Sequence, residues 1–169
     1  MFGLYHFLMA HILIICTANI CRSPVGEALL RDRLQKRGLA QWTCESAGTW
    51  ALWPRGASQF SIDVAQQMGL DISRHQSRMI DETLLERADL VLCMELGQVE
   101  ALQVEFPNHA DKIHLLSEMA GQQYSVHDPY GEPLVMYQQM ADELSLLIDN
   151  GLERIIELAG ENEHHHQQK

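Results

Sequence analysis

Short apolar runs alternate along the chain with longer stretches in which apolar residues recur at helical spacing. The apolar runs predict strands over residues 11–15, 42–46, 90–94 and 113–116. Helical spacing predicts helices over residues 24–37, 58–68, 81–87, 95–106 and 134–158, and several of these are followed by Gly or Pro. Regular alternation of strands and helices predicts a parallel sheet whose two faces are both covered by helices.

The chain of 169 residues is of ordinary length for one domain with its own core. We therefore expect a three-layer α/β/α fold with a four-stranded parallel sheet, of the Rossmann or flavodoxin type. The domain is predicted to span residues 9–160, after an N-terminal extension of residues 1–8 and before a polar, disordered tail of residues 161–169. Ligands of such sheets bind beyond the carboxyl ends of the strands.

Composition and charge exclude some classes of function. The formal net charge of −11 argues against a nucleic-acid partner. The apolar residues 1–15 are too few to span a bilayer, and no basic residue precedes them as in a secretory signal. Four cysteines in an acidic chain of this size indicate reduced thiols, so we expect a cytoplasmic protein.

The segment after the first predicted strand carries a cysteine and an arginine, Cys16 and Arg22, with five residues between them. Ser23 and Pro24 follow, a pair typical of a helix N-terminus. A tight loop between a strand and a helix turns backbone N–H groups inward, and the helix dipole adds positive charge. Arg22 can hold two oxygens of a phosphate. In that field we expect Cys16 to ionise and act as a nucleophile in covalent phosphate transfer.

Two simpler interpretations of this cysteine are a buried thiol that only packs and a metal ligand. Buried strands often carry cysteine as a small apolar residue, but the helix start that follows is unusual for that case. The spacing of Cys16 and Cys21 is not that of a zinc pair, and no second pair lies at zinc-like spacing, so we expect no metal ion and no cofactor. Three consecutive histidines at residues 164–166 are expected to be solvated.

From about residue 10 to residue 156 the chain resembles the low-molecular-weight protein tyrosine phosphatases. Residues 16–24 are similar to the family signature Cys-x-Gly-Asn-x-Cys-Arg-Ser-Pro, and residues 46–49, 75–78 and 128–130 resemble three further family segments in the same order. Ala18 stands where the family usually has glycine, which requires a backbone φ that is not strongly positive. Glu95 stands where many members have aspartate, and we expect little effect.

The resemblance implies a catalytic role for three residues: Cys16 as nucleophile, Arg22 as phosphate ligand and Asp128 as general acid and base. It further implies that the phosphate and substrate contact Thr17, Ala18, Asn19, Ile20, Cys21, Ser23, Trp53 and Tyr130. Ser46 and His75 are implied to support the loop. Trp50 is an alternative to Trp53 as an aromatic wall of the cleft.

Several roles stay open from the sequence. Ser23 can cap the helix, bind the thiolate, or do both. Cys21 can form a protective disulfide with Cys16 or merely pack. Arg78 can pair with a carboxylate under the site or be a surface cation.

The expected substrates are phosphotyrosine proteins. By family analogy they include an autophosphorylated bacterial tyrosine kinase that controls exopolysaccharide export. Arginine phosphatases of the family tend to carry Thr where this chain has Ile20. Arsenate reductase and a non-catalytic phosphate-binding module are further alternatives; the first requires additional relay cysteines, and the second is marked by loss of the catalytic residues. The oligomeric state cannot be inferred.

Overall fold

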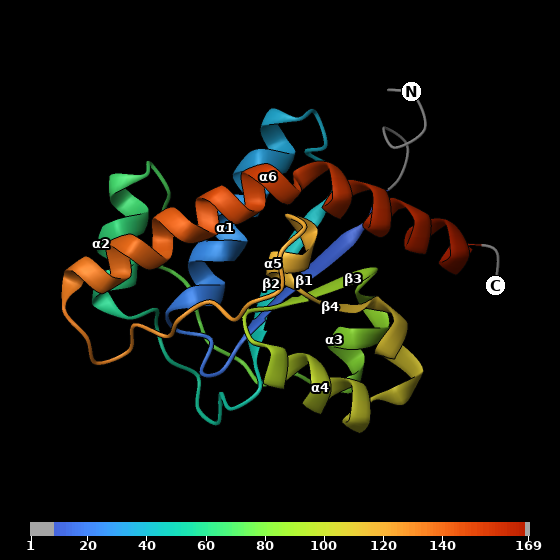
Figure 1. The fold of residues 1–169 in the computed structure, drawn as a ribbon, viewed down its shortest axis with the longest axis horizontal. Coiled ribbons are helices and arrows are strands. Elements are labelled where there is room, and N and C mark those ends of the chain that lie inside the picture. Colours follow the sequence, from blue (N-terminus) through green and yellow to red (C-terminus); the bar gives the residue numbers. More distant parts are fainter. Residues whose placement is uncertain (1–8, 168–169) are drawn as a thin grey trace.

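The computed structural model describes residues 9–167 (Figure 1). Four parallel strands form one sheet in the order β2-β1-β3-β4, with the bounds β1 His11–Cys16, β2 Thr43–Gly48, β3 Leu90–Cys93 and β4 Ile113–Leu115. The helices are α1 Arg22–Lys36, α2 Gln59–Gln67, α3 Glu82–Arg87, α4 Leu96–Glu105, α5 Leu116–Met119 and α6 Leu134–Gln167, with a 3-10 helix at Pro107–Lys112. The predicted α/β fold with a four-stranded parallel sheet is confirmed.

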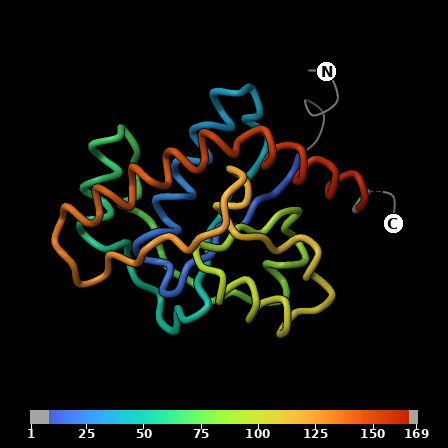
Figure 2. Tube along the Cα trace, in the orientation of Figure 1, coloured from blue at the N-terminus to red at the C-terminus, as the bar shows by residue number. Residues whose placement is uncertain are grey.

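The central strand β1 has a buried face on each side, which explains its unbroken apolar sequence. Ile12 and Ile14 belong to the core shared with α1 and α6, whereas Leu13 and Ile15 belong to the core shared with α3 and α4. Figures 1 and 2 show α1, α2 and α6 on one side of the sheet and α3 and α4 on the other. Successive side chains of a strand point to opposite faces, so a strand between two helical layers is apolar throughout.

The boundaries differ from the predicted ones where tertiary contacts decide them. Strand β1 includes Cys16, and β2 ends at Gly48, because the two strands stay paired up to that residue pair. Helix α1 begins at Arg22, two residues before Pro24, with Cys21 as its N-cap residue and no capping side chain. Ser23 therefore does not cap the helix. The carboxyl ends of β1 and β2 therefore lie side by side, near the start of α1.

The C-terminal end of the chain is helical where we expected disorder. Helix α6 continues through residues 161–167, so the predicted tail is wrong over that range. Asn162 donates a side-chain hydrogen bond to Asp89 O at 2.8 Å, and Glu163 is only 7% exposed. These contacts with the rest of the domain hold the last turns of α6. The local apolar pattern does not predict them. The predicted extension 1–8 and residues 168–169 lie outside the described residues.

Arginine side chains cover the outer edge of β2. Arg31 Nη2 donates to Cys44 O at 3.2 Å, and Arg78 Nε donates to Ser46 O at 3.1 Å. Gly48 N donates to Arg78 O at 2.9 Å, which closes the same edge at its carboxyl end. Carbonyls that are already bonded cannot template another strand. Within residues 9–167, none of the helices combines the length and apolar character that crossing a membrane requires.

Candidate active site

The loop between β1 and α1 carries Cys16 at its start and Arg22 at its end. The carboxyl end of β2 holds this loop, because Thr49 N donates to Cys16 O at 3.0 Å and Trp50 N donates to Thr17 O at 2.8 Å. Gly48 is needed for this approach: a Cβ at that position would lie 2.4 Å from Thr17 O. Two neighbouring strand ends therefore position Cys16 and the loop that follows it.

Asn19 lies at the centre of the loop and is fully buried. Its φ is 57°, and among the described residues it is the only non-glycine with a positive φ. Its Nδ2 donates to Ser23 Oγ at 2.7 Å and to Ser46 Oγ at 2.9 Å, while its Oδ1 accepts from Arg78 N at 3.0 Å. Asparagine tolerates this left-handed conformation better than most residues. Ala18 avoids it, so alanine at the usual glycine position is accommodated.

The hydrogen bonds around Cys16 run in one direction. Ser23 Oγ accepts from Asn19 and lies 2.9 Å from Cys16 Sγ, which leaves its hydroxyl hydrogen for the sulfur. Ser46 Oγ also accepts from Asn19 and donates to Glu27 Oε2 at 2.6 Å. A donor aimed at sulfur stabilises a thiolate. The open role of Ser23 is thus assigned to the thiol, and Glu27 is a member of the network that sequence reasoning missed.

His75 contacts the same loop through the backbone of Asn19. A carbonyl oxygen can only accept, so His75 Nε2 donates to Asn19 O, at 2.6 Å. Burial is the largest influence on its pKa and lowers it, which favours the neutral ring. The Arg78 side chain pairs with Glu45 at 3.2 Å, so it has the carboxylate partner that was one of its two expected roles.

Arg22 is 1% exposed and holds two carboxylates. Its Nη2 lies 3.1 Å from Asp128 Oδ2, and its Nη1 lies 2.6 Å from Glu95 Oε1 and 2.8 Å from Val126 O. Glu95 thus contacts Arg22 directly, a contact that the sequence did not reveal. Tyr130 N donates to Asp128 Oδ1 at 3.2 Å and so fixes the second carboxylate.

A cavity of about 220 Å³ opens over this loop. It is lined by Cys16, Thr17, Ala18, Ile20, Cys21, Arg22, Arg55, Asp128 and Tyr130. Most of the predicted substrate contacts are thus brought together. Trp53 is not among the lining residues and is 73% exposed, so the cavity wall predicted for it is not formed. Arg55 was missed; the one available signal was a lone basic residue in an otherwise uncharged loop.

Cys21 lines the cavity, and it is a free thiol, as are the other three cysteines. Its Sγ lies 3.3 Å from Ser58 Oγ and 3.7 Å from Tyr137 OH. Burial raises its pKa, so Cys21 is held as a neutral thiol. No group of three or more potential ligands among the described residues is placed to hold a metal ion.

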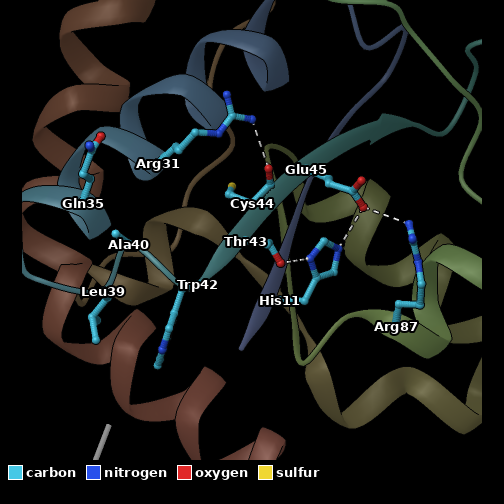
Figure 3. Close-up of a pocket in the computed structure, with 10 residues that line it drawn as sticks. All are labelled: His11, Arg31, Gln35, Leu39, Ala40, Trp42, Thr43, Cys44, Glu45 and Arg87. Carbon is cyan, nitrogen blue, oxygen red and sulfur yellow. Dashed lines mark hydrogen bonds and ion pairs between the residues drawn. The ribbon is translucent and has the colours of Figure 1, made fainter. Parts of the chain in front are cut away.

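A larger cavity of about 770 Å³ lies at the amino ends of β1 and β2 (Figure 3). The carboxylate of Glu45 there bridges His11 Nε2 at 3.0 Å and Arg87 Nη2 at 2.9 Å. The cysteine that lines this larger cavity, Cys44, is buried, and desolvation raises the pKa of its thiol strongly. The reactive groups therefore gather in the smaller cavity, where a thiol with a hydrogen-bond donor, an arginine and a carboxyl group surround space for a small anion.

Comparison with known proteins agrees with this arrangement. The family described as "Low molecular weight phosphotyrosine protein phosphatase" matches residues 11–160. A probable low molecular weight protein-tyrosine-phosphatase, EpsP, of Ralstonia nicotianae is 33% identical over 85% of this chain and 94% of its own length. A protein-arginine-phosphatase of Bacillus subtilis is also 33% identical, over 81% and 91%. The crystal structure of a low molecular weight protein tyrosine phosphatase from T. tengcongensis superposes with a TM-score of 0.81 at 38% identity, covering 86% of this chain and 99% of that one.

Proposed function

Because this chain belongs to the low molecular weight phosphotyrosine protein phosphatase family, we propose that it hydrolyses phosphotyrosine in proteins through a phosphocysteine on Cys16. One observation carries the proposal: Asp128 lines the same cavity as Cys16 and Arg22, although it lies more than 100 residues from their loop in the chain. Family membership supports the phosphatase activity. The hydrogen bonds of the loop support the roles of the individual residues.

In the first step the Cys16 thiolate attacks phosphorus from the side opposite to the tyrosine oxygen. The S–P bond forms as the P–O bond breaks, and Asp128 gives its proton to the leaving phenolate. Arg22 and the inward N–H groups of the loop hold the three remaining phosphate oxygens as charge shifts among them. For this, Arg22 exchanges its contact with Asp128 for the phosphate, which frees the carboxyl group to carry a proton.

In the second step water replaces the thiolate on phosphorus. Asp128, now ionised, accepts a proton from the water, the O–P bond forms, and the S–P bond breaks to release inorganic phosphate. The sulfur leaves as a thiolate, and the Ser23 hydroxyl at 2.9 Å stabilises that charge. The thiolate is thereby regenerated for the next turnover.

Turnover of p-nitrophenyl phosphate in a chelator-containing, reducing buffer tests the proposal. We expect hydrolysis by the wild type and none by Cys16→Ser, with a phosphoenzyme trapped in acid only when Cys16 is present. Cys21→Ser is the matched control, since it makes the same change in the same loop and should still yield the phosphoenzyme. Equal loss in both variants would contradict the assignment of the nucleophile.

A second comparison isolates the acid. Asp128→Asn should slow hydrolysis of phenyl phosphate more than that of p-nitrophenyl phosphate, because the poorer leaving group needs the proton more. We expect a loss of roughly 10²–10³-fold for the poorer leaving group. The same loss for both esters would assign Asp128 to phosphate binding instead.

Phosphoarginine is a second candidate substrate, because a protein-arginine-phosphatase is as similar to this chain as EpsP is. Ile20 favours phosphotyrosine: it lines the cavity as an apolar residue where arginine phosphatases of the family tend to carry Thr. Hydrolysis of matched phosphotyrosine and phosphoarginine peptides decides between the two. Release of phosphate from the phosphoarginine peptide at the higher kcat/KM would overturn our choice.

For the cellular setting we propose phosphorylated proteins as partners, among them an autophosphorylated tyrosine kinase of the exopolysaccharide export system. A nucleophilic thiol needs a reducing compartment, which favours the cytoplasm. Loss of phosphate from such a kinase, when it is mixed with wild type but not with Cys16→Ser, would support this partner.

A further inference from the structure

Arg55 lines the cavity that contains Cys16, yet no carboxylate among residues 9–167 pairs with it. Its guanidinium has no ion pair and no hydrogen bond to any of the described residues, and the residue is exposed. Arg22, the other basic residue of the cavity lining, is paired with Glu95 and Asp128. The cavity therefore presents one unpaired positive charge beside the phosphate site.

Hydrogen bonds hold the backbone around Arg55, so the point from which this side chain extends is fixed. Arg55 N donates to Ser77 Oγ at 2.9 Å, and Ser77 N donates to Arg55 O at 2.7 Å. The same serine hydroxyl donates to Trp53 O at 3.0 Å. Ser77 is buried, and Ser58 N donates to Ile20 O at 2.8 Å, which ties the end of the segment to the phosphate loop.

The same segment exposes large apolar side chains. Trp50, Leu52 and Trp53 are 67%, 53% and 73% exposed. Trp50 N donates to the carbonyl of Thr17, which lines the cavity, so the backbone that carries these apolar side chains lies next to the cavity. Exposed aromatic groups next to an arginine are typical of a surface that binds polypeptide. A polypeptide whose phosphorylated residue enters the cavity would lie against this segment.

The charge of the whole molecule affects which polypeptides can approach the cavity. With a formal net charge of −11, the protein repels acidic polypeptides at long range. An unpaired arginine at the cavity gives such a substrate one local partner, and its planar fork matches a carboxylate. We propose that Arg55 selects phosphotyrosine sites that carry an Asp or Glu side chain next to the phosphotyrosine. The proposal rests on the function proposed above and narrows its substrate class.

Matched phosphotyrosine peptides that differ only in the neighbouring residue, Glu, Gln or Lys, test it. For the wild type we expect kcat/KM to be roughly threefold to fivefold higher with Glu than with Gln, the range of a partly exposed ion pair. Arg55→Gln should abolish this ratio, and Arg55→Glu should favour the Lys peptide. The preference should shrink in 0.5 M salt, about five times the ionic strength at which the Debye length is about 10 Å.

Arg74→Gln is the matched control. Arg74 is also an exposed arginine that makes no hydrogen bond or ion pair with the described residues, and it lines a different cavity, in which its charge acts on Asp71. This variant should keep the wild-type ratio. Binding of the three peptides to Cys16→Ser gives a second readout, so that the selection is measured even if turnover fails and the proposed function falls.

Two results would overturn the inference. The first is a Glu-to-Gln ratio near one in the wild type, or a ratio that survives in Arg55→Gln. The second is an equal loss for all peptides and for p-nitrophenyl phosphate in Arg55→Gln, which would mean that Arg55 holds the phosphate itself.

Discussion

At the scale of single residues, Asn19 combines an uncommon backbone conformation with a buried side chain that makes three hydrogen bonds. Most substitutions at this position therefore alter both the backbone conformation and the side-chain hydrogen bonds. Glycine keeps the freedom to adopt φ near 57° and removes only the side chain. Alanine removes the side chain and also strains the backbone.

We expect Asn19→Gly to lower the free energy of unfolding by about 2–4 kcal/mol, because Ser23, Ser46 and Arg78 N lose their partner in the interior. Asn19→Ala should cost about 1 kcal/mol more. Urea unfolding measures both. If Asn19→Gly has the same free energy of unfolding as the wild type, the hydrogen bonds of this side chain contribute little to stability.

Gly48 shows how a missing side chain can be required by a neighbour. A Cβ there would stand 2.4 Å from Thr17 O, so Gly48→Ala must displace the strand end or the phosphate loop. We expect a loss of about 2 kcal/mol or more and a large fall in kcat/KM for p-nitrophenyl phosphate.

Gly97→Ala is the control for that substitution. A Cβ at Gly97, in α4, would meet nothing within 4 Å, so this variant should be as stable as the wild type or up to about 1 kcal/mol more stable. Normal activity in Gly48→Ala would contradict the role of the strand contact.

At the scale of elements, the last turns of α6 depend on a contact between helix and sheet layer. Asn162 donates to the carbonyl of Asp89, the residue before β3, and Asp89 in turn accepts from His11 N at 2.7 Å. This contact lies at the amino ends of the strands, away from Cys16. The end of α6 therefore belongs to the stability of the fold and not to the chemistry.

Asn162→Ala should lower the free energy of unfolding by about 1 kcal/mol, the typical net worth of such a hydrogen bond, and leave turnover of p-nitrophenyl phosphate unchanged. Glu161→Ala, one residue away and exposed, is the comparison. If thermal or urea unfolding gives the same stability for both variants, the helix end is not held by this contact.

At the scale of the whole molecule, protonation of partly buried histidines couples stability to pH. Burial lowers the pKa of His75 in the folded protein below the usual value of about 6.5. Between these two pKa values the unfolded chain binds more protons, so this contribution to stability is complete above about pH 6.5 and is lost as the pH falls toward the folded pKa. His11 behaves in the same sense, because burial also lowers its pKa.

We expect the urea midpoint of the wild type to fall more steeply between about pH 6.5 and pH 5 than that of His75→Gln. The difference between the two proteins is the quantity to measure, because the many carboxylates titrate alike in both. Parallel curves would show that His75 is free to protonate in the folded state.

Local periodicity accounts for what could be predicted of the fold. The strand β1 could be predicted from its own residues, because a strand that is buried on both faces is apolar at every position. The strand–loop–helix segment from Cys16 to Arg22 is equally local, so Cys16 and Arg22 could be proposed as nucleophile and phosphate ligand without coordinates. The end of α6 was missed because a polar sequence is held there by Asp89, which lies 73 residues away.

The amino-acid sequence by itself determined the order of strands and helices. It also predicted an anion-binding loop and, through resemblance, the placement of Cys16 and Asp128 in one site. Only the tertiary structure decided that Glu95 contacts Arg22, that Trp53 does not line the cavity, and that Arg55 lines it without an ion pair to any described residue. The reason is physical. Periodicity and turn chemistry act over a few neighbouring residues, whereas a side chain's partner and exposure depend on segments that meet only when the sheet and its helices have packed.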